Sequence, residues 1–168
     1  MRIASYNILT GGEGRADPLI EVLLAQRADV VGLVEAEDPT VLERIARRLK
    51  MDYVQATGNK SGASALLSRF PIRDSINQAA FQPDLSKSLL QASVVDPSGQ
   101  AWQFGVVHRE CRGTAKPLPE DYSRQLRRSR DMWPVGLVIS GDGGCRRGPA
   151  GRGQVSPAKP AQAPPSGS

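Results

Sequence analysis

"DVVGLVEAED", residues 29–38, is the stretch of sequence that decides the fold class. Its apolar run from Val30 to Val34, interrupted only by Gly32, is typical of a core strand that is covered on both faces. The run ends in a carboxylate, Glu35. A charge at the end of a buried strand is costly unless it is solvated, paired or bound to a metal. The stretch alone therefore leaves two interpretations open, a solvated strand end and a functional site.

The residues around this stretch predict alternating strands and helices. A strand over residues 2–9 and the strand over 29–35 are each followed by an Asp-Pro pair, Asp17-Pro18 and Asp38-Pro39. Each pair is typical of a helix that begins with an aspartate N-cap and a proline in its first turn. Apolar residues recur at helical spacing after both pairs. This β-α-β-α order predicts an α/β protein.

Short strand candidates separated by turn residues follow the two helices. They are "YVQAT" (53–57), "GASALLSRF" (62–70), "IRDSINQ" (72–78), "SLLQASVVD" (88–96), "AWQFGVVH" (101–108) and "PVGLVISGD" (134–142). The residues "DPSG" (96–99) are expected to form a hairpin turn, and residues 121–131 to form a polar helix. We therefore expect antiparallel hairpins to complete the sheet.

Length and composition narrow the class of protein. The 168 residues suffice for one domain with a real core. No apolar run approaches the roughly 20 residues that span a bilayer, and the N-terminus lacks the features of a signal peptide. The two cysteines, Cys111 and Cys145, show no metal-binding spacing, so we expect neither a disulfide framework nor a zinc site. A reducing cytoplasm fits this cysteine usage.

The positive charge of the chain lies in its C-terminal part. Residues 1–109 hold 12 basic and 12 acidic residues, whereas residues 110–168 hold 10 basic and 5 acidic ones. We expect a folded domain over residues 1–144 and a disordered basic tail over 145–168, because the tail is mostly Gly, Pro and Ala. Such a tail is either simply solvated or binds nucleic acid through its charge. It offers almost no aromatic side chains for stacking on bases.

Polar side chains stand at the carboxyl ends of several predicted strands. Asn7 ends the first strand, Glu35 the second and Asp142 the last, and His108, the one histidine of the sequence, ends the strand before it. In open α/β sheets, ligands bind beyond the carboxyl ends of the strands. An amide, two carboxylates and an imidazole suit a hard divalent cation such as Mg²⁺ that holds a phosphate. A lone histidine is equally compatible with a structural role.

Five of these segments together resemble a known family. They are "SYNIL" (5–9), "DVVGLVEAE" (29–37), "GASALLSRFPI" (62–72), "FGVVH" (104–108) and "VISGD" (138–142). In order and spacing they resemble successive motifs of the endonuclease/exonuclease/phosphatase superfamily. The resemblance implies a four-layer α/β/β/α sandwich, here with an incomplete second sheet. It also implies hydrolysis of a phosphoester with Mg²⁺ or Mn²⁺. The substrate, a nucleic acid, a lipid headgroup or a sugar phosphate, stays open.

The resemblance assigns a role to each polar strand end. It implies that Glu35 is the principal Mg²⁺ ligand and that Asn7 lies beside the metal and the scissile phosphate. It implies that His108 contacts the phosphate and that Asp142 positions or deprotonates the attacking water. Ser68-Arg69 are expected to be structural. Glu37 and Asp38 are expected to be a solvated residue and a helix cap.

The sequence departs from the family near its end. Gly143-Gly144 stand where the family has Phe-Asn, and no histidine follows His108 to supply the family's terminal Asp-His pair. We therefore expect a C-terminally truncated member of the family. Two functions from different classes remain: a Mg²⁺-dependent phosphoester hydrolase, and a non-catalytic remnant with at most weak metal binding. A nucleic-acid-binding protein that works through its basic tail is a third alternative.

Overall fold

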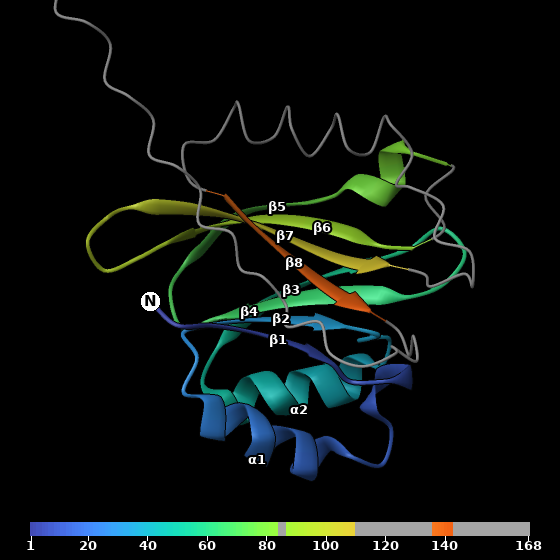
Figure 1. Ribbon diagram of the computed structural model, residues 1–168, viewed down its shortest axis with the longest axis horizontal. Helices are drawn as coiled ribbons and strands as arrows, with labels where there is room; N and C mark the ends of the chain where they lie inside the picture. The colour runs from blue at the N-terminus through green and yellow to red at the C-terminus, as the bar shows by residue number, and fades with distance from the viewer. Residues whose placement is uncertain (84–86, 110–135, 143–168) are drawn as a thin grey trace, which may run out of the picture.

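Two facing sheets with helices on one side form the described part of the protein (Figure 1). A computed structural model describes residues 1–83, 87–109 and 136–142. The predicted helix over 121–131, both cysteines and the tail over 145–168 lie outside these ranges. Among the described helices, none is both long and apolar enough to span a bilayer. The α/β sandwich predicted from the sequence is confirmed. The helical layer that the sandwich implies on the far side of the second sheet corresponds to residues 121–131, which lie outside the described ranges.

The elements alternate as predicted in the first part of the chain and become hairpins in the second. The first part contains β1 (Ile3–Asn7), η1 (Thr10–Gly12), α1 (Ala16–Gln26), β2 (Val30–Val34), α2 (Pro39–Leu49), β3 (Asp52–Thr57) and β4 (Ala63–Ser68). The second contains β5 (Ile72–Asn77), η2 (Gln78–Phe81), β6 (Leu89–Val95), β7 (Ala101–Arg109) and β8 (Gly136–Asp142). The strand order is β1-β2-β4-β3 in the first sheet and β5-β6-β7-β8 in the second.

Helix α2 begins as the sequence predicts. The Asp38 carboxylate accepts hydrogen bonds from the backbone N–H groups of Thr40 at 2.8 Å and Val41 at 3.3 Å. Pro39 occupies the start of the helix, where its missing N–H has no cost. Substituting such a cap with alanine typically costs about 1 kcal/mol. Asp38 therefore fixes where the chain turns into α2 after the strand end at Glu35.

Helix α1 begins two residues earlier than predicted. It starts at Ala16, and Arg15 in the cap position makes no side-chain cap. The prediction that Asp17 is an N-cap was wrong, because this carboxylate binds the Arg44 guanidinium at 2.7 and 2.8 Å. Asp17 therefore connects the first turn of α1 to α2. The pair is exposed, and such pairs contribute at most about 1 kcal/mol.

Strand β2 contributes to both hydrophobic cores. Val31 and Leu33 pack with α1 and α2 in the core between the helices and the first sheet. Val30 and Val34 face the opposite way, into the core between the two sheets. All four side chains are fully buried. The apolar run is continuous because neither face of this strand meets water.

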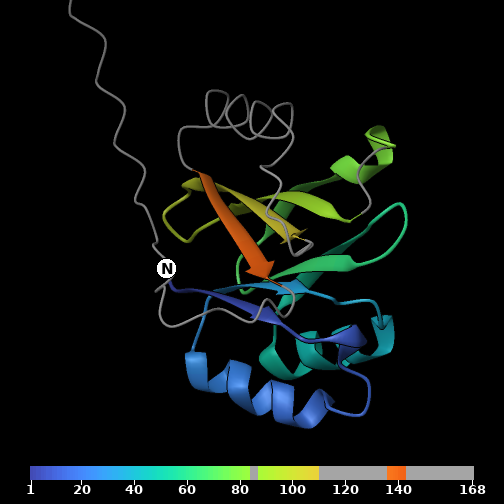
Figure 2. The ribbon, with the colours of Figure 1, turned by 45° about the vertical axis from the view of Figure 1, so that its right-hand side comes forward.

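One end of the sandwich holds most of the carboxyl ends of the strands (Figure 2). β1 and β2 are parallel and end side by side, and β7 and β8 do the same. β4 runs antiparallel to β2, and β6 runs antiparallel to β7, so both begin at this end. The last residues of β1, β2, β7 and β8 thus lie near the residues that precede β4 and β6. We call this the polar end.

The predicted turn over 96–99 joins β6 to β7. Asp96 Oδ1 accepts hydrogen bonds from the Ser98 N–H at 2.9 Å, the Ser98 hydroxyl at 2.5 Å and the Gln100 N–H at 3.0 Å. Asp96 Oδ2 accepts one from the Trp102 indole N–H at 2.9 Å. These donors, Ser98 first and Trp102 second, lower the pKa of Asp96 from 3.8 to about 2. The ionised carboxylate is therefore the form that holds the turn.

We predict that Asp96 stabilises the fold above about pH 4 and loses this effect as the pH falls to about 2. A depressed folded-state pKa means that the unfolded chain binds the proton first, so acid favours unfolding. Asp96→Asn is expected to melt below the wild type at pH 7, and the difference in Tm is expected to shrink between pH 4 and pH 2. Glu21→Gln, an exposed change on α1, is the control. A Tm difference that does not vary with pH would contradict this prediction.

Candidate active site

The Glu35 carboxylate lies at the polar end, one residue beyond β2. Its Oε1 accepts a hydrogen bond from Asn7 Nδ2 at 3.0 Å, and its Oε2 accepts one from the Thr10 N–H at 3.1 Å. The side chain is 17% exposed. Asn7 is itself oriented, because its Oδ1 accepts a hydrogen bond from the Leu9 N–H at 2.8 Å. The first sheet and the loop after β1 therefore hold the carboxylate in one place.

His108 approaches the same carboxylate from the second sheet. Its Nε2 lies 3.4 Å from Glu35 Oε1, and its side chain is 5% exposed. The other ring nitrogen, Nδ1, is buried and has no hydrogen-bond partner among the described residues. A buried polar atom without a partner is uncommon in native proteins and often marks a functional position.

Opposing effects act on the pKa of Glu35. Burial, the largest effect, raises this pKa, but the hydrogen bonds from Asn7 and Thr10 lower it. Electrostatic interactions with His108 and Lys87 lower it further, and the net pKa is below the ordinary value of 4.5. Glu35 is therefore ionised at neutral pH. A partly buried anion with hydrogen-bond donors on two sides is chemically suited to hold a cation.

The backbone around this carboxylate adopts an unfavourable conformation. Leu9, Thr10 and Glu35 all have left-handed φ values, 54°, 52° and 57°. This conformation is costly for residues other than glycine, above all for the β-branched Thr10. The Arg15 guanidinium donates hydrogen bonds to the carbonyl groups of Ile8, at 2.9 Å, and Leu9, which holds the loop. Such strain persists only where the surroundings determine the conformation, and it concentrates at functional sites.

Glu37 has a more specific role than the solvated residue expected from the sequence. Although the residue is exposed, its Oε2 accepts a hydrogen bond from the Gly11 N–H at 3.0 Å. Its Oε1 accepts one from the Ala63 N–H at 3.1 Å. The carboxylate thus joins the loop after β1 to the start of β4, next to Glu35.

An open cavity of about 580 Å³ lies over these residues. It is lined by Thr10, Gly11, Glu13, Glu35, Glu37, Asp38, Ser61, Gly62, Lys87 and His108. Among the described residues, no group of three or more His, Cys, Asp or Glu side chains is arranged to hold a metal ion. A cation at Glu35 would therefore complete its coordination with amide, water or substrate oxygens.

The structure brings together the side chains of three residues predicted from the sequence, Asn7, Glu35 and His108. For Asp142 it places the backbone, which ends β8 and pairs with Arg109 beside His108. Sequence reasoning missed Gly62 and Lys87, which precede strands instead of following them. Recognition that β4 and β6 run antiparallel to β2 and β7 would have revealed both.

Two facing sheets, an outer helical layer and a polar site at the strand ends define this chain as an α/β sandwich protein. The sequence model of the Endonuclease/Exonuclease/phosphatase family matches residues 4–139, and the chain belongs to that family. No curated protein sequence gives a significant match. The resemblance seen in the sequence motifs is thereby confirmed.

Solved structures of low sequence identity share the fold. TDP2 of D. rerio, complexed with a single-strand DNA product, matches with a TM-score of 0.64 and 20% identity over 84% of this chain and 59% of that chain. A β-hairpin deletion mutant of the beta toxin from Staphylococcus aureus gives 0.58 and 15% over 84% and 65%. An endonuclease/exonuclease/phosphatase from Beutenbergia cavernae gives 0.56 and 20% over 82% and 46%. The chain thus spans about half to two thirds of these structures.

We predict that Glu35→Gly is more stable than Glu35→Ala by about 1 kcal/mol, because glycine adopts the left-handed backbone without strain. Both variants remove the carboxylate, so their difference isolates the backbone. The measurement is the free energy of unfolding in urea. Glu43, which is exposed within α2, is the control position. There the Glu43→Ala variant is expected to be more stable than Glu43→Gly by a similar amount, because the backbone is helical. Equal stability of the two Glu35 variants would show that the backbone at this site is not strained.

Proposed function

We propose that this chain carries the site of a Mg²⁺-dependent phosphoester hydrolase, with Glu35 as the carboxylate that anchors the metal. Membership of the family suggests a metal-dependent phosphoesterase. The single observation that carries the proposal is the position of Glu35. It is a partly buried, ionised carboxylate that Asn7 and the loop after β1 hold at the strand ends.

The donors at this site fit a hard cation. Mg²⁺ prefers oxygen ligands and is commonly bound by one or two carboxylates together with water and substrate phosphate. Glu35 supplies the carboxylate, and the Asn7 oxygen retains a second lone pair beside its hydrogen bond from Leu9. No thiolate lies among the described lining residues, so a soft metal is not favoured. Mn²⁺ accepts the same ligands.

The proposed chemistry divides the work among four residues. Bound Mg²⁺ would supply Lewis-acid polarisation of the phosphoryl oxygen and stabilisation of the leaving oxygen. Asn7 keeps the Glu35 carboxylate oriented. We assign to His108 the contact with the phosphate and to Asp142 the positioning or deprotonation of the attacking water.

Two observations bear on the substrate class. TDP2 of D. rerio was solved with a single-strand DNA product, which favours a phosphodiester. Residues 1–109, however, have no net charge, whereas an enzyme dedicated to DNA usually presents a basic face. A generic phosphodiester is therefore the appropriate first substrate.

A second candidate function, a remnant with little turnover, is favoured by the sequence after β8. Gly144 stands where the family has an asparagine, and the sequence holds one histidine. General acid–base catalysis contributes typically 10²–10⁴-fold to the rate, about as much as or more than a single preorganised donor. A site without both the family's asparagine and its second histidine would keep little of a normal rate, even if the two losses were only partly additive.

We predict that the full chain hydrolyses bis(p-nitrophenyl) phosphate barely above background in Mg²⁺ or Mn²⁺, and that Glu35→Gln abolishes whatever rate exists. Release of p-nitrophenol measures the rate, and calorimetric titration of Mn²⁺ measures metal binding. Glu43→Gln, on the exposed face of α2, is the matched control and should change neither quantity.

Two results would change this conclusion. Fast metal-dependent turnover that Glu35→Gln abolishes, and that survives deletion of residues 145–168, would exclude the remnant. Mn²⁺ binding that is equally strong in Glu35→Gln and the wild type would reject Glu35 as the anchor of the metal.

A further inference from the structure

Lys87 lies at the polar end, although it belongs to none of the five sequence segments that resemble the family. It precedes β6, whose first residue, Leu89, pairs with Val107 near the end of β7. Because β6 and β7 are antiparallel, the residues before β6 lie beside His108. Lys87 is half-buried and lines the same cavity as Glu35.

Gly62 shapes the space between Lys87 and His108. Its φ is +79°, and a Cβ built on it would lie 3.2 Å from His108 Nδ1 and 3.6 Å from Lys87 Nζ. It would also lie 3.0 Å from Lys87 Cδ. The absence of a side chain therefore lets Lys87 and His108 pack close to the Gly62 backbone, where a Cβ would crowd them. We call the part of the cavity that Gly62, Lys87 and His108 line the cradle.

The charges around the cradle indicate what it would hold. Four of the lining residues are carboxylates, and Lys87 is the one lysine or arginine among them. Within the described ranges, no carboxylate lies within ion-pair distance of Lys87. Glu35 already has donors from Asn7 and Thr10. The Lys87 ammonium group is therefore available to an anion that enters the cavity.

We propose that Lys87 binds a non-bridging oxygen of the substrate's phosphate in the cradle, beside the cation held by Glu35. This inference rests on the proposed function of the site and adds a substrate-binding residue to it. A lysine acts on a phosphate as a compact point charge with three rotatable donors. Gly62 allows Lys87 and His108 to lie this close together at the cavity, because a Cβ at this position would crowd both side chains.

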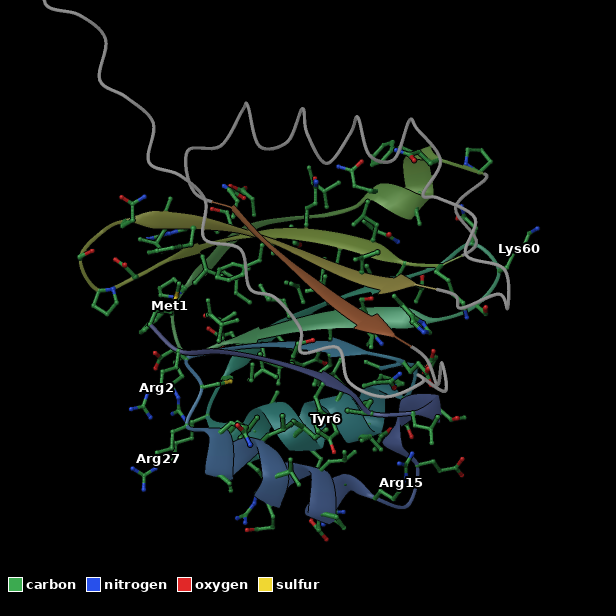
Figure 3. All side chains as sticks on the ribbon, viewed as in Figure 1. Met1, Arg2, Tyr6, Arg15, Arg27 and Lys60 are labelled. Atoms are coloured by element: carbon green, nitrogen blue, oxygen red, sulfur yellow. The ribbon has the colours of Figure 1, made fainter. Side chains whose placement is uncertain are left out.

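The test compares Lys87→Met with Lys60→Met in the full chain. Lys60 carries the same charge but is exposed, points away from the sandwich and does not line the cavity (Figure 3). Inorganic phosphate, titrated calorimetrically in the presence of Mg²⁺, is the probe. Lys87→Met is expected to weaken phosphate binding about 5-fold or more, since that is the effect of one charge at contact distance in water. Lys60→Met should leave phosphate binding unchanged.

Mn²⁺ affinity in the absence of phosphate separates a binding role from a structural one. Removal of a positive charge near Glu35 is expected to leave Mn²⁺ affinity unchanged or to increase it. A structural defect would instead weaken the binding of both phosphate and Mn²⁺, and that result would overturn the proposal. Equal phosphate affinity of Lys87→Met and the wild type, or no phosphate binding by the wild type, would overturn it as well.

Glu35→Gln, measured in parallel, keeps the two proposals distinguishable. Unchanged Mn²⁺ affinity in Glu35→Gln rejects the metal site and with it the proposed function. A normal loss of Mn²⁺ binding in Glu35→Gln, together with unchanged phosphate affinity in Lys87→Met, rejects the cradle alone.

Discussion

The Glu35 carboxylate joins the two sheets of this protein at their polar end. It receives hydrogen bonds from the first sheet and its following loop, and His108 meets it from the second sheet. A partly buried charge is costly without such partners, and Asn7, the Thr10 N–H and His108 supply them from three different elements.

The two-sided burial of β2 explains why the sequence predicted so much of the fold. A strand with both faces covered needs a layer on each side, and the run from Val30 to Val34 already implied this. The cap at Asp38 could also be predicted from the sequence, because an N-cap side chain binds backbone N–H groups only two or three residues further along the chain. Both are properties of short stretches of chain. The family match and the solved structures then agree with the same sandwich at identities of 15 to 20%.

The features that the sequence did not reveal depend on partners far along the chain. Asp17 resembles a cap, but Arg44, 27 residues later, binds its carboxylate. Glu37 resembles a surface residue until the start of β4 is placed beside it. Lys87 becomes visible only when β6 is known to run antiparallel to β7. Polar residues at the carboxyl ends of strands follow a general rule of α/β sheets, whereas residues before antiparallel strands follow the particular pairing.

The left-handed residues at the site have an evolutionary consequence. Leu9, Thr10 and Glu35 occupy a backbone conformation that glycine or asparagine adopts more easily. A lineage released from selection on activity would gain stability by drifting to those residues, because strained functional sites and stability oppose each other. A lineage that still uses the site is held to the less stable sequence. Natural variation at these three positions is therefore a record of whether the carboxylate has remained under selection.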